Sequence, residues 1–446
     1  MDFIKKNYRY FLFFFFSFFV VFVLICKDIT FDPINEYGMS HAIRMGEVPY
    51  KDFNTVSTPL FIIFSSLGLF FYDSFAVYLI EACLLYTLAY FSFQKILGKN
   101  SILIVFAMCL ILFRCFIPTY NTMAFTLIIF LMYLERKKVP DIWIGVVLGL
   151  LVLSKQTIGI PVFLITCIGI REWKRIWDRT KGCLIVGGVF ILYLLLTGAF
   201  TSFFDLCLFG LFDFGSNNHL LTPSFIICTC LMVLTTLYFL KKDSKNILFY
   251  YALGAVFLVI PICDFSHFPY YLPIFLIPII EKYNEKISLK YLPYALLVVF
   301  ICINIGLRLD YLKNVTFSPF HHFEGTLMYE PSIPRVQKIL DRMGECSSYE
   351  VIDAMGMFSS IVLDQNINYF DVPLHGNYGY LGTKGMMKKV DSLTDTYFFI
   401  NEKYLEKFER GEINQYTQMD YELIRYVVDH SEKIEDLNHL AIYYKK

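Results

Sequence analysis

The sequence predicts a polytopic α-helical membrane protein of about eleven spans, followed by a small extracytoplasmic C-terminal α/β domain. Of its 446 residues, 57% are apolar and 17% are charged, whereas a soluble domain has roughly 45–50% and about 25%. The mean hydropathy is +0.54. Apolar runs repeat along residues 1–308, and the chain from 309 onward is polar. These observations exclude a single soluble core, a collagen and a coiled coil.

The spans are predicted from apolar runs that approach the ~20 residues needed to cross a bilayer. The first run, residues 10–25, follows a basic segment and precedes Lys27 and Asp28 instead of a small-residue cleavage site, so we expect it to remain as an anchor. The other runs, several of them short, lie at 74–94, 101–117, 120–134, 140–154, 158–170, 182–200, 222–240, 247–262, 268–281 and 289–308.

The basic residues predict the orientation, because short cytoplasmic loops carry an excess of Lys and Arg. With eleven spans, every basic loop falls on the side of the N-terminus. Residues 58–72 are apolar but only 15 long, and counting them as a span would invert the later loops, so we expect a helix in the outer interface. The basic loops are Lys95 with Lys99, 135–138, 171–181, 241–245 and 281–290.

This arrangement predicts a multi-pass protein of the cell membrane with a cytoplasmic N-terminus. Residues 1–308 form the transmembrane domain, with a first outer loop at 27–73, and residues 309–446 form the extracytoplasmic domain. Strand-like pieces at 349–353, 360–364 and 396–400 indicate that the latter is α/β. The 39 basic and 39 acidic residues balance, which predicts no nucleic-acid partner.

Ionisable side chains gather at the predicted outer side of the bundle. Each is costly near the membrane, at roughly 2.5–3.5 kcal/mol on insertion scales, so each needs a reason to be retained. If the loops that carry them converge, they form a pocket of carboxylates and fixed cations at the lipid–water boundary. These residues include Asp32, Glu36, Asp52, Arg114, Lys155, Asp264 and His267.

Such a pocket suits the transfer of a sugar from a lipid carrier. Nucleotide sugars are absent outside the cytoplasm, so the expected donor is a polyprenyl-phosphate-linked sugar. A Lys or Arg stabilises the leaving phosphate, and a carboxylate deprotonates the acceptor hydroxyl as a general base. Direct displacement with one base predicts inversion at the anomeric carbon. The scheme requires no cofactor, since one phosphate can be met by cationic side chains, and it leaves the use of a divalent metal open.

Three stretches resemble one family. TFDPINEYGMSHAIRMGEVPYKDFNTVSTPL is similar to the first extracytoplasmic loop of GT-C superfamily glycosyltransferases, the bacterial relatives of protein O-mannosyltransferases and aminoarabinose transferases. LLVLSKQTIG resembles a later K-Q-x-G break of that family, and SHFPYYLPIFLIPII resembles its His/Tyr-Pro helix. In the first loop, the matching residues are Asp32, Glu36, Tyr37, Gly46, Pro49, Tyr50, Asp52, Pro59 and Leu60.

The resemblance covers about residues 1–310 and implies a GT-C transmembrane fold. It also implies a polyprenyl-phosphate-linked sugar donor, with a glycan, lipid or protein as acceptor and membrane lipids around the bundle. The chain departs from family members with adjacent Asp-Glu, because its acids are Asp32 and Glu36 with Pro33 between them.

We expect Asp32 to take the proton of the acceptor, with Glu36 one helical turn away on the same face if residues 32–44 are helical. Competing interpretations are a solvated loop acid for Asp32 and interaction with a helix dipole for Glu36.

The other site residues are expected to bind substrate. Each has a structural alternative: snorkelling to lipid headgroups for the two cations, a turn or helix cap for the acid and the imidazole, and an aromatic belt for the tyrosine. The expected ligands of the donor phosphate are Lys155 and Arg114, and the expected ligands of sugar hydroxyls are Asp52, His267 and Tyr270.

Two other functions remain open at this point. An outer-face polysaccharide polymerase or ligase with a pyrophosphate-linked donor would have a similar build, although the 201–221 loop lacks the arginines expected of one. A transporter or lipid flippase would not be an enzyme at all. Transporters commonly contain repeated halves, and the sequence shows no internal repeat.

Overall fold

The computed structural model describes residues 2–25, 31–217, 221–287, 291–353, 355–372, 377–412, 420–437 and 440–446. The start of the predicted first outer loop (27–30), residues 218–220 of the loop predicted at 201–221 and the end of the basic loop at 281–290 (288–290) lie outside the described residues.

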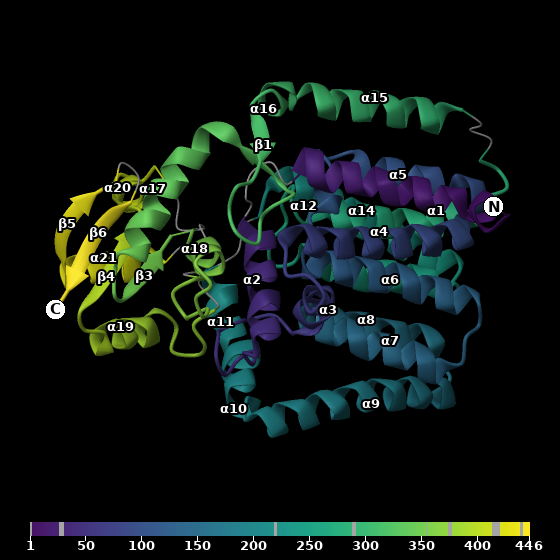
Figure 1. Ribbon diagram of the computed structural model, residues 1–446. Helices are drawn as coiled ribbons and strands as arrows, with labels where there is room; N and C mark the ends of the chain where they lie inside the picture. The colour runs from purple at the N-terminus through teal and green to yellow at the C-terminus, as the bar shows by residue number, and fades with distance from the viewer. Residues whose placement is uncertain are drawn as a thin grey trace.

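Long apolar helices lie side by side and form the body of the molecule (Figure 1). Among the described residues, four helical segments are long and apolar enough to cross a membrane: Asn7–Leu24, Phe75–Cys109, Trp173–Thr197 and Pro223–Lys242. The helices of this body are α1 (Asp2–Phe19), continued by η1 (Val20–Ile25), then α4 (Phe75–Leu97), α5 (Ile102–Cys109), α6 (Tyr120–Arg136), α7 (Asp141–Ser154), α8 (Gln156–Ile170), α9 (Trp173–Thr197), α12 (Pro223–Lys242), α13 (Ile247–Gly254), α14 (Phe268–Lys282) and α15 (Leu292–Gly306).

The outward faces of these helices are apolar. On α9, Val189 is 66% exposed and Leu196 is 80% exposed, and on α12 Leu231 and Leu234 are 59% and 62% exposed. Soluble monomers rarely expose contiguous apolar surface of this kind. The exposed belt and the apolar helices are therefore compatible with insertion into a membrane, as the composition predicts.

Two shorter helices cross one end of the bundle. α2 (Phe31–Met45) stands upright in Figure 1, and α3 (Leu60–Leu69) is seen nearly end-on, whereas the long helices run across the view. α3 has 10 residues, which at ~1.5 Å per residue is about half of the ~30 Å hydrocarbon core. The same end carries α10 (Phe200–Phe203), η4 (Phe204–Phe209) and α11 (Gly210–Asn217).

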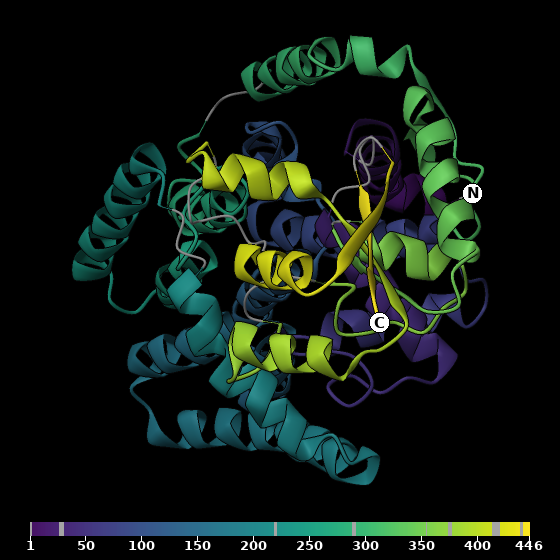
Figure 2. The ribbon, with the colours of Figure 1, turned by 90° about the vertical axis from the view of Figure 1, so that its left-hand side faces the viewer.

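The C-terminal part contains a four-stranded sheet of order β3-β4-β6-β5. β3 pairs parallel to β4, and the other pairs are antiparallel. Helices α17, α19, α20 and α21 accompany the sheet (Figure 2). The bounds are β3 (Tyr349–Ile352), β4 (Thr396–Ile400), β5 (Glu432–Asp436), β6 (Ala441–Lys445), α17 (Ile333–Gly344), α18 (Gly356–Val362), α19 (Gly382–Ser392), α20 (Glu402–Glu409) and α21 (Tyr421–Asp429); α16 (Leu309–Leu312) and the hairpin β1 (Val315–Phe317)–β2 (Leu327–Tyr329) precede them.

The expected strand at 360–364 is wrong, because α18 occupies most of that segment. α18 packs against α2, where a Cβ on Gly38 would lie 2.1 Å from the sulfur of Met357. Ser360 also donates a hydrogen bond to Asp371 at 3.0 Å. Tertiary packing therefore overrides the β-branched pattern of this short piece.

The N-terminus and the C-terminal sheet lie at opposite ends of the bundle (Figure 1). Ion pairs join several of the basic segments at the end away from the sheet: Arg136 contacts Glu281, and Lys282 Nζ lies 3.4 Å from Asp243. The basic segments that predicted the cytoplasmic side therefore lie close together in the structure.

Helices α7 and α9 approach each other closely through glycines. A Cβ on Gly182 would lie 2.2 Å from the carbonyl oxygen of Ile142, and one on Gly145 would lie 2.1 Å from that of Arg179. Small residues allow such backbone contact between membrane helices.

Replacing Gly182 with Ala should separate α7 from α9 and lower the stability of the bundle by about 1–3 kcal/mol, the usual cost of overpacking. Thermal unfolding of the purified protein in detergent measures this effect. Gly188→Ala on the same helix is the matched control, because its Cβ would meet nothing within 4 Å. Equal midpoints for the two variants would contradict the close contact.

Candidate functional site

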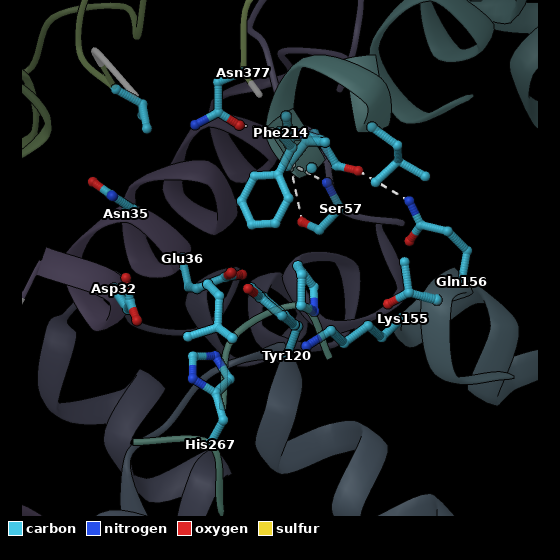
Figure 3. Close-up of a pocket in the computed structure, with 18 of the residues that line it drawn as sticks. Asp32, Asn35, Glu36, Ser57, Tyr120, Lys155, Gln156, Phe214, His267 and Asn377 are labelled. Carbon is cyan, nitrogen blue, oxygen red and sulfur yellow. Dashed lines mark hydrogen bonds between the residues drawn. The ribbon is translucent and has the colours of Figure 1, made fainter. Parts of the chain in front are cut away.

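A cavity of about 250 Å³ lies where α2 crosses the end of the bundle. Its walls come from α2, the 55–57 loop, the α7–α8 break, α11 and the 258–267 segment, with a contribution from the C-terminal domain. Figure 3 shows its polar side chains around one space. The polar lining residues are Asp32, Asn35, Glu36, Thr55, Ser57, Tyr120, Lys155, Gln156, Thr157, His267 and Asn377.

One face of α2 supplies the carboxylates. Asp32, Asn35, Glu36 and Met39 all line the cavity, and their spacing of three and four residues places them on one stripe of a helix. Asp32 lies in the first turn of α2. The predicted proximity of the two acids is therefore present in the structure.

Glu36 is buried without a partner. Its side chain is 4% exposed, and Oε2 has no hydrogen-bond partner among the described residues; the same holds for Oδ1 of Asn35. Desolvation, followed by the nearby charge of Asp32, raises the pKa of Glu36 to about 8. Buried polar atoms are usually hydrogen-bonded. Because carboxyl oxygens of Glu47, Glu81 and Glu350 also lack a partner but lie outside the cavity lining, it is the position of Glu36 in the cavity wall that makes it a candidate to bind a ligand group.

Asp32 is exposed to the interior of the cavity. Desolvation by the surrounding walls raises the pKa of its carboxyl, while the neighbouring charges of His267 and Lys155 oppose the rise. Asp32 is thus the more accessible acid, and it lies within the electrostatic reach of the Lys155 ammonium and the His267 ring.

Lys155 lies in an extended break between α7 and α8, with φ −156° and ψ 101°. Its ammonium donates a hydrogen bond to Asn121 Oδ1 at 2.7 Å and lies 5.1 Å from the centre of the Tyr120 ring. Desolvation lowers the pKa of Lys155 to about 8, although Asp32 opposes the shift. A cation held this way is poorly compensated by solvent and is available to an anion.

His267 enters the cavity from the start of α14. Its Nδ1 donates a hydrogen bond to Asp264 Oδ1 at 2.9 Å, because a carboxylate can only accept. Nε2 is then the ring nitrogen left for a ligand in the cavity. Asp32, Glu36 and His267 also offer oxygen and nitrogen ligands of the kind that divalent metals use. The positive charge of Lys155 beside them would repel a metal ion.

Residues that the sequence did not single out complete the cavity. Gln156 donates to the carbonyl oxygens of Val56 at 3.1 Å and Cys207 at 3.3 Å, so it joins the 55–57 loop to η4. Asn377 of the C-terminal domain accepts a hydrogen bond from the Val56 amide at 3.3 Å. Phe214 of α11 also faces the space (Figure 3).

Three expected substrate-binding residues do not line the cavity. Asp52 accepts a hydrogen bond from the Val48 amide at 2.7 Å, which gives it a role in its own turn. Tyr270 is 3% exposed and donates to the Ile117 carbonyl at 3.0 Å. The guanidinium of Arg114 stacks 4.4 Å from the Phe265 ring centre. Arg114 is still near enough to oppose the rise in the pKa of Asp32.

No protein-family model, no curated protein and no solved structure matches the chain.

Glu36→Gln should remove a pH-dependent cost from the folded state. The pKa of Glu36 in the folded protein, about 8, lies above the ordinary value of 4.5. Between those pH values the unfolded chain loses the Glu36 proton while the folded protein keeps it, so the free energy of unfolding falls as the pH rises. The variant should therefore gain stability over the wild type, by up to a few kcal/mol, between about pH 5 and about pH 8.

Chemical unfolding at the two pH values measures this difference. Glu285→Gln is the control, since Glu285 is exposed, and it should track the wild type at both pH values. A Glu36→Gln variant that also tracks the wild type would show that Glu36 is not buried unpartnered.

Proposed function

We propose that the protein is an inverting membrane glycosyltransferase that moves a sugar from a polyprenyl-phosphate donor to an acceptor hydroxyl at the outer membrane face. The observation that carries the proposal is the convergence of Asp32, Lys155 and His267, from three distant parts of the chain, on one cavity at the end of the bundle. The resemblance of the first loop and of the K-Q-x-G break to GT-C enzymes supports it.

In this proposal, Asp32 accepts the proton of the acceptor hydroxyl as the hydroxyl oxygen attacks the anomeric carbon. A raised pKa suits this role, since a general base is most effective when its pKa lies near the working pH. Glu36, protonated near neutral pH because of its raised pKa of about 8, donates a hydrogen bond to the sugar or to Asp32. His267 orients the sugar hydroxyls through Nε2.

Lys155 binds the phosphate that leaves with the polyprenyl chain and stabilises its developing charge. It is the one Lys or Arg among the described lining residues of the cavity. A single cation is better matched to one phosphate than to a pyrophosphate, which favours the polyprenyl-phosphate donor over the pyrophosphate-linked donor of a polymerase or ligase. Arg114, at the margin, adds to the positive potential around Asp32.

The placement of polar groups also favours an enzyme over a transporter or flippase. A transport site is expected near the middle of the bilayer, between repeated halves. Here the cavity opens at one end, and the bundle beside it is filled by buried side chains such as Tyr86, Phe125 and Ile128.

We propose the following topology for this enzyme: about eleven spans, a cytoplasmic N-terminus and an extracytoplasmic C-terminal domain in the cell membrane. The ion-paired basic segments at the end remote from the cavity support this orientation. Asn377 and Val372 bring the C-terminal domain to the cavity wall, so this domain is placed to recognise the acceptor, whether glycan, lipid or protein.

Asp32→Asn should lower the rate of sugar transfer by about 10²-fold or more, because the amide cannot accept the proton of the acceptor hydroxyl. The assay uses purified protein with a panel of polyprenyl-phosphate sugars and measures release of polyprenyl phosphate. The matched control is Asp52→Asn, a second acid of the same loop that lies outside the cavity lining and should retain transfer. Full activity of Asp32→Asn at normal protein levels would remove Asp32 as the base.

Lys155→Arg should change the pH profile of transfer. Lys155 loses its charge above its pKa of about 8, so wild-type activity should fall as the pH rises through that value. Arginine keeps its charge, and the alkaline limb should therefore move to higher pH while weaker donor binding raises KM. If the alkaline limb of the pH profile does not move, another group such as Glu36 causes it. That result would contradict the phosphate-binding role of Lys155.

A further inference from the structure

A second cluster of titratable side chains lies outside the cavity, at the junction between α2 and the C-terminal domain. We call it the junction cluster; it consists of His41 on α2, Asp73 between α3 and α4, His322 between β1 and β2, and Asp364 after α18. None of the four lines the cavity. Three chain segments that are far apart in sequence therefore meet through polar side chains at this point.

Asp73 fixes the tautomer of both histidines. Nδ1 of His41 donates to Asp73 Oδ2 at 2.7 Å, and Nδ1 of His322 donates to the backbone oxygen of Asp73 at 3.1 Å. Both acceptors lack a proton to give, so each Nδ1 must carry one. Tyr37 and Arg44 also contact the Asp73 carboxylate, at 3.1 and 3.3 Å.

Three residues of the cluster bring possible metal-ligand atoms close together. One ligand atom from each of His41, His322 and Asp364 lies within 4.8 Å of the other two. Nε2 of His322 is 2.8 Å from Asp364 Oδ1. With Nδ1 protonated, an Nε2 atom without a proton would repel this carboxylate oxygen, so the contact requires a positive charge: a second proton on the ring or a metal ion bound by both groups.

His41 adds a third ligand to this pair. Its side chain is 3% exposed, and its Nε2 has no hydrogen-bond partner among the described residues. A proton on His322 satisfies Asp364 but makes no use of the His41 ring beside it. A metal ion held by all three residues satisfies both rings and the carboxylate.

We propose that His41, His322 and Asp364 form a zinc site that ties α2 to the C-terminal domain. Two imidazoles and a carboxylate are ligands that Zn²⁺ accepts. The second contact of each ring, from Nδ1 to a carboxylate or a backbone carbonyl, is the outer-shell arrangement found around zinc-bound histidines. Asp364 is 56% exposed, so it can move by the small distance that tetrahedral binding requires.

The fourth position of the zinc ion is filled by His321 or by water. Nε2 of His321 lies 3.6 Å from Asp364 Oδ2, and its ring centre is 4.0 Å from that of His322. Because His321 is exposed on its other side, where it faces Glu324 at 3.4 Å, the site remains accessible to an incoming ion.

The test is a zinc titration of the full chain, purified in detergent without a polyhistidine tag and treated with a chelator. Calorimetry with ZnCl₂ should show one high-affinity site per chain, and Co²⁺ in its place should give the visible spectrum of a tetrahedral site. Asp364→Asn and His322→Ala should each weaken binding by at least about 10-fold. Zinc should also raise the thermal midpoint of the wild type and raise it less in these variants.

Three variants keep the result interpretable. Asp364→Asn changes an exposed side chain and should fold even if His322→Ala does not. His430→Ala removes a histidine at the end of α21, distant in the fold from the cluster, and should bind zinc as the wild type does. His267→Ala should also keep the site.

The proposal is overturned if the wild type binds no zinc, which would leave a proton as the charge between His322 and Asp364. It is equally overturned if His267→Ala loses binding while Asp364→Asn retains it, because the ion would then lie in the cavity.

Discussion

The cost of burying an ionisable group without a partner is the constraint on which this structure depends. At the end of the bundle remote from the cavity, the cost is offset: the fully buried guanidinium of Arg179 contacts both Glu135 and Asp141 at 2.7 Å. In the cavity, Glu36 is almost as deeply buried and has an unpartnered oxygen. Leaving a buried polar group unpaired costs about 1–3 kcal/mol or more, and in the cavity a bound ligand group would offset that cost.

The break at Lys155 shows how the fold positions a cation within that constraint. Irregular backbone at membrane depth is tolerated where it lines a cavity and its polar groups find partners. The hydroxyl of Thr58 donates to the Val152 carbonyl at 3.0 Å, and the Lys155 carbonyl accepts from the amides of Ile158 and Gly159. Thr58 thus completes the hydrogen bonding of a break in the bundle, which couples the cation to the segment that follows α2, the helix of the two carboxylates.

The sequence alone was sufficient for the helical character, for the polar C-terminal domain and for a large part of the cavity. Costly charges outside the basic loops identified Asp32, Glu36, Lys155 and His267, and all four line it. The same reasoning also selected Asp52 and Tyr270, which bond to backbone groups elsewhere. Charge and aromatic content give the position of a residue along the chain but not the direction in which its side chain points.

Other parts of the site depend on contacts between distant segments, which no local pattern reports. Asn377 reaches the cavity from a domain that begins near residue 309, and α18 forms where the local sequence predicted a strand. The pairing of His322 with His41 is of the same kind. In the sequence His322 is one of two adjacent histidines in a polar segment, and only the fold brings a third histidine and two aspartates beside them.

Helix α2 connects these observations, because its two faces serve different neighbours. The stripe that holds Asp32 and Glu36 lines the cavity, while Tyr37 and His41 contact Asp73 on another side and Gly38 allows α18 to approach. A helix of 15 residues is rigid over this length, so a shift of the C-terminal domain against Gly38 or His41 also shifts the two carboxylates. The position of the domain that contributes Asn377 to the cavity wall is therefore mechanically linked to the geometry of the proposed base.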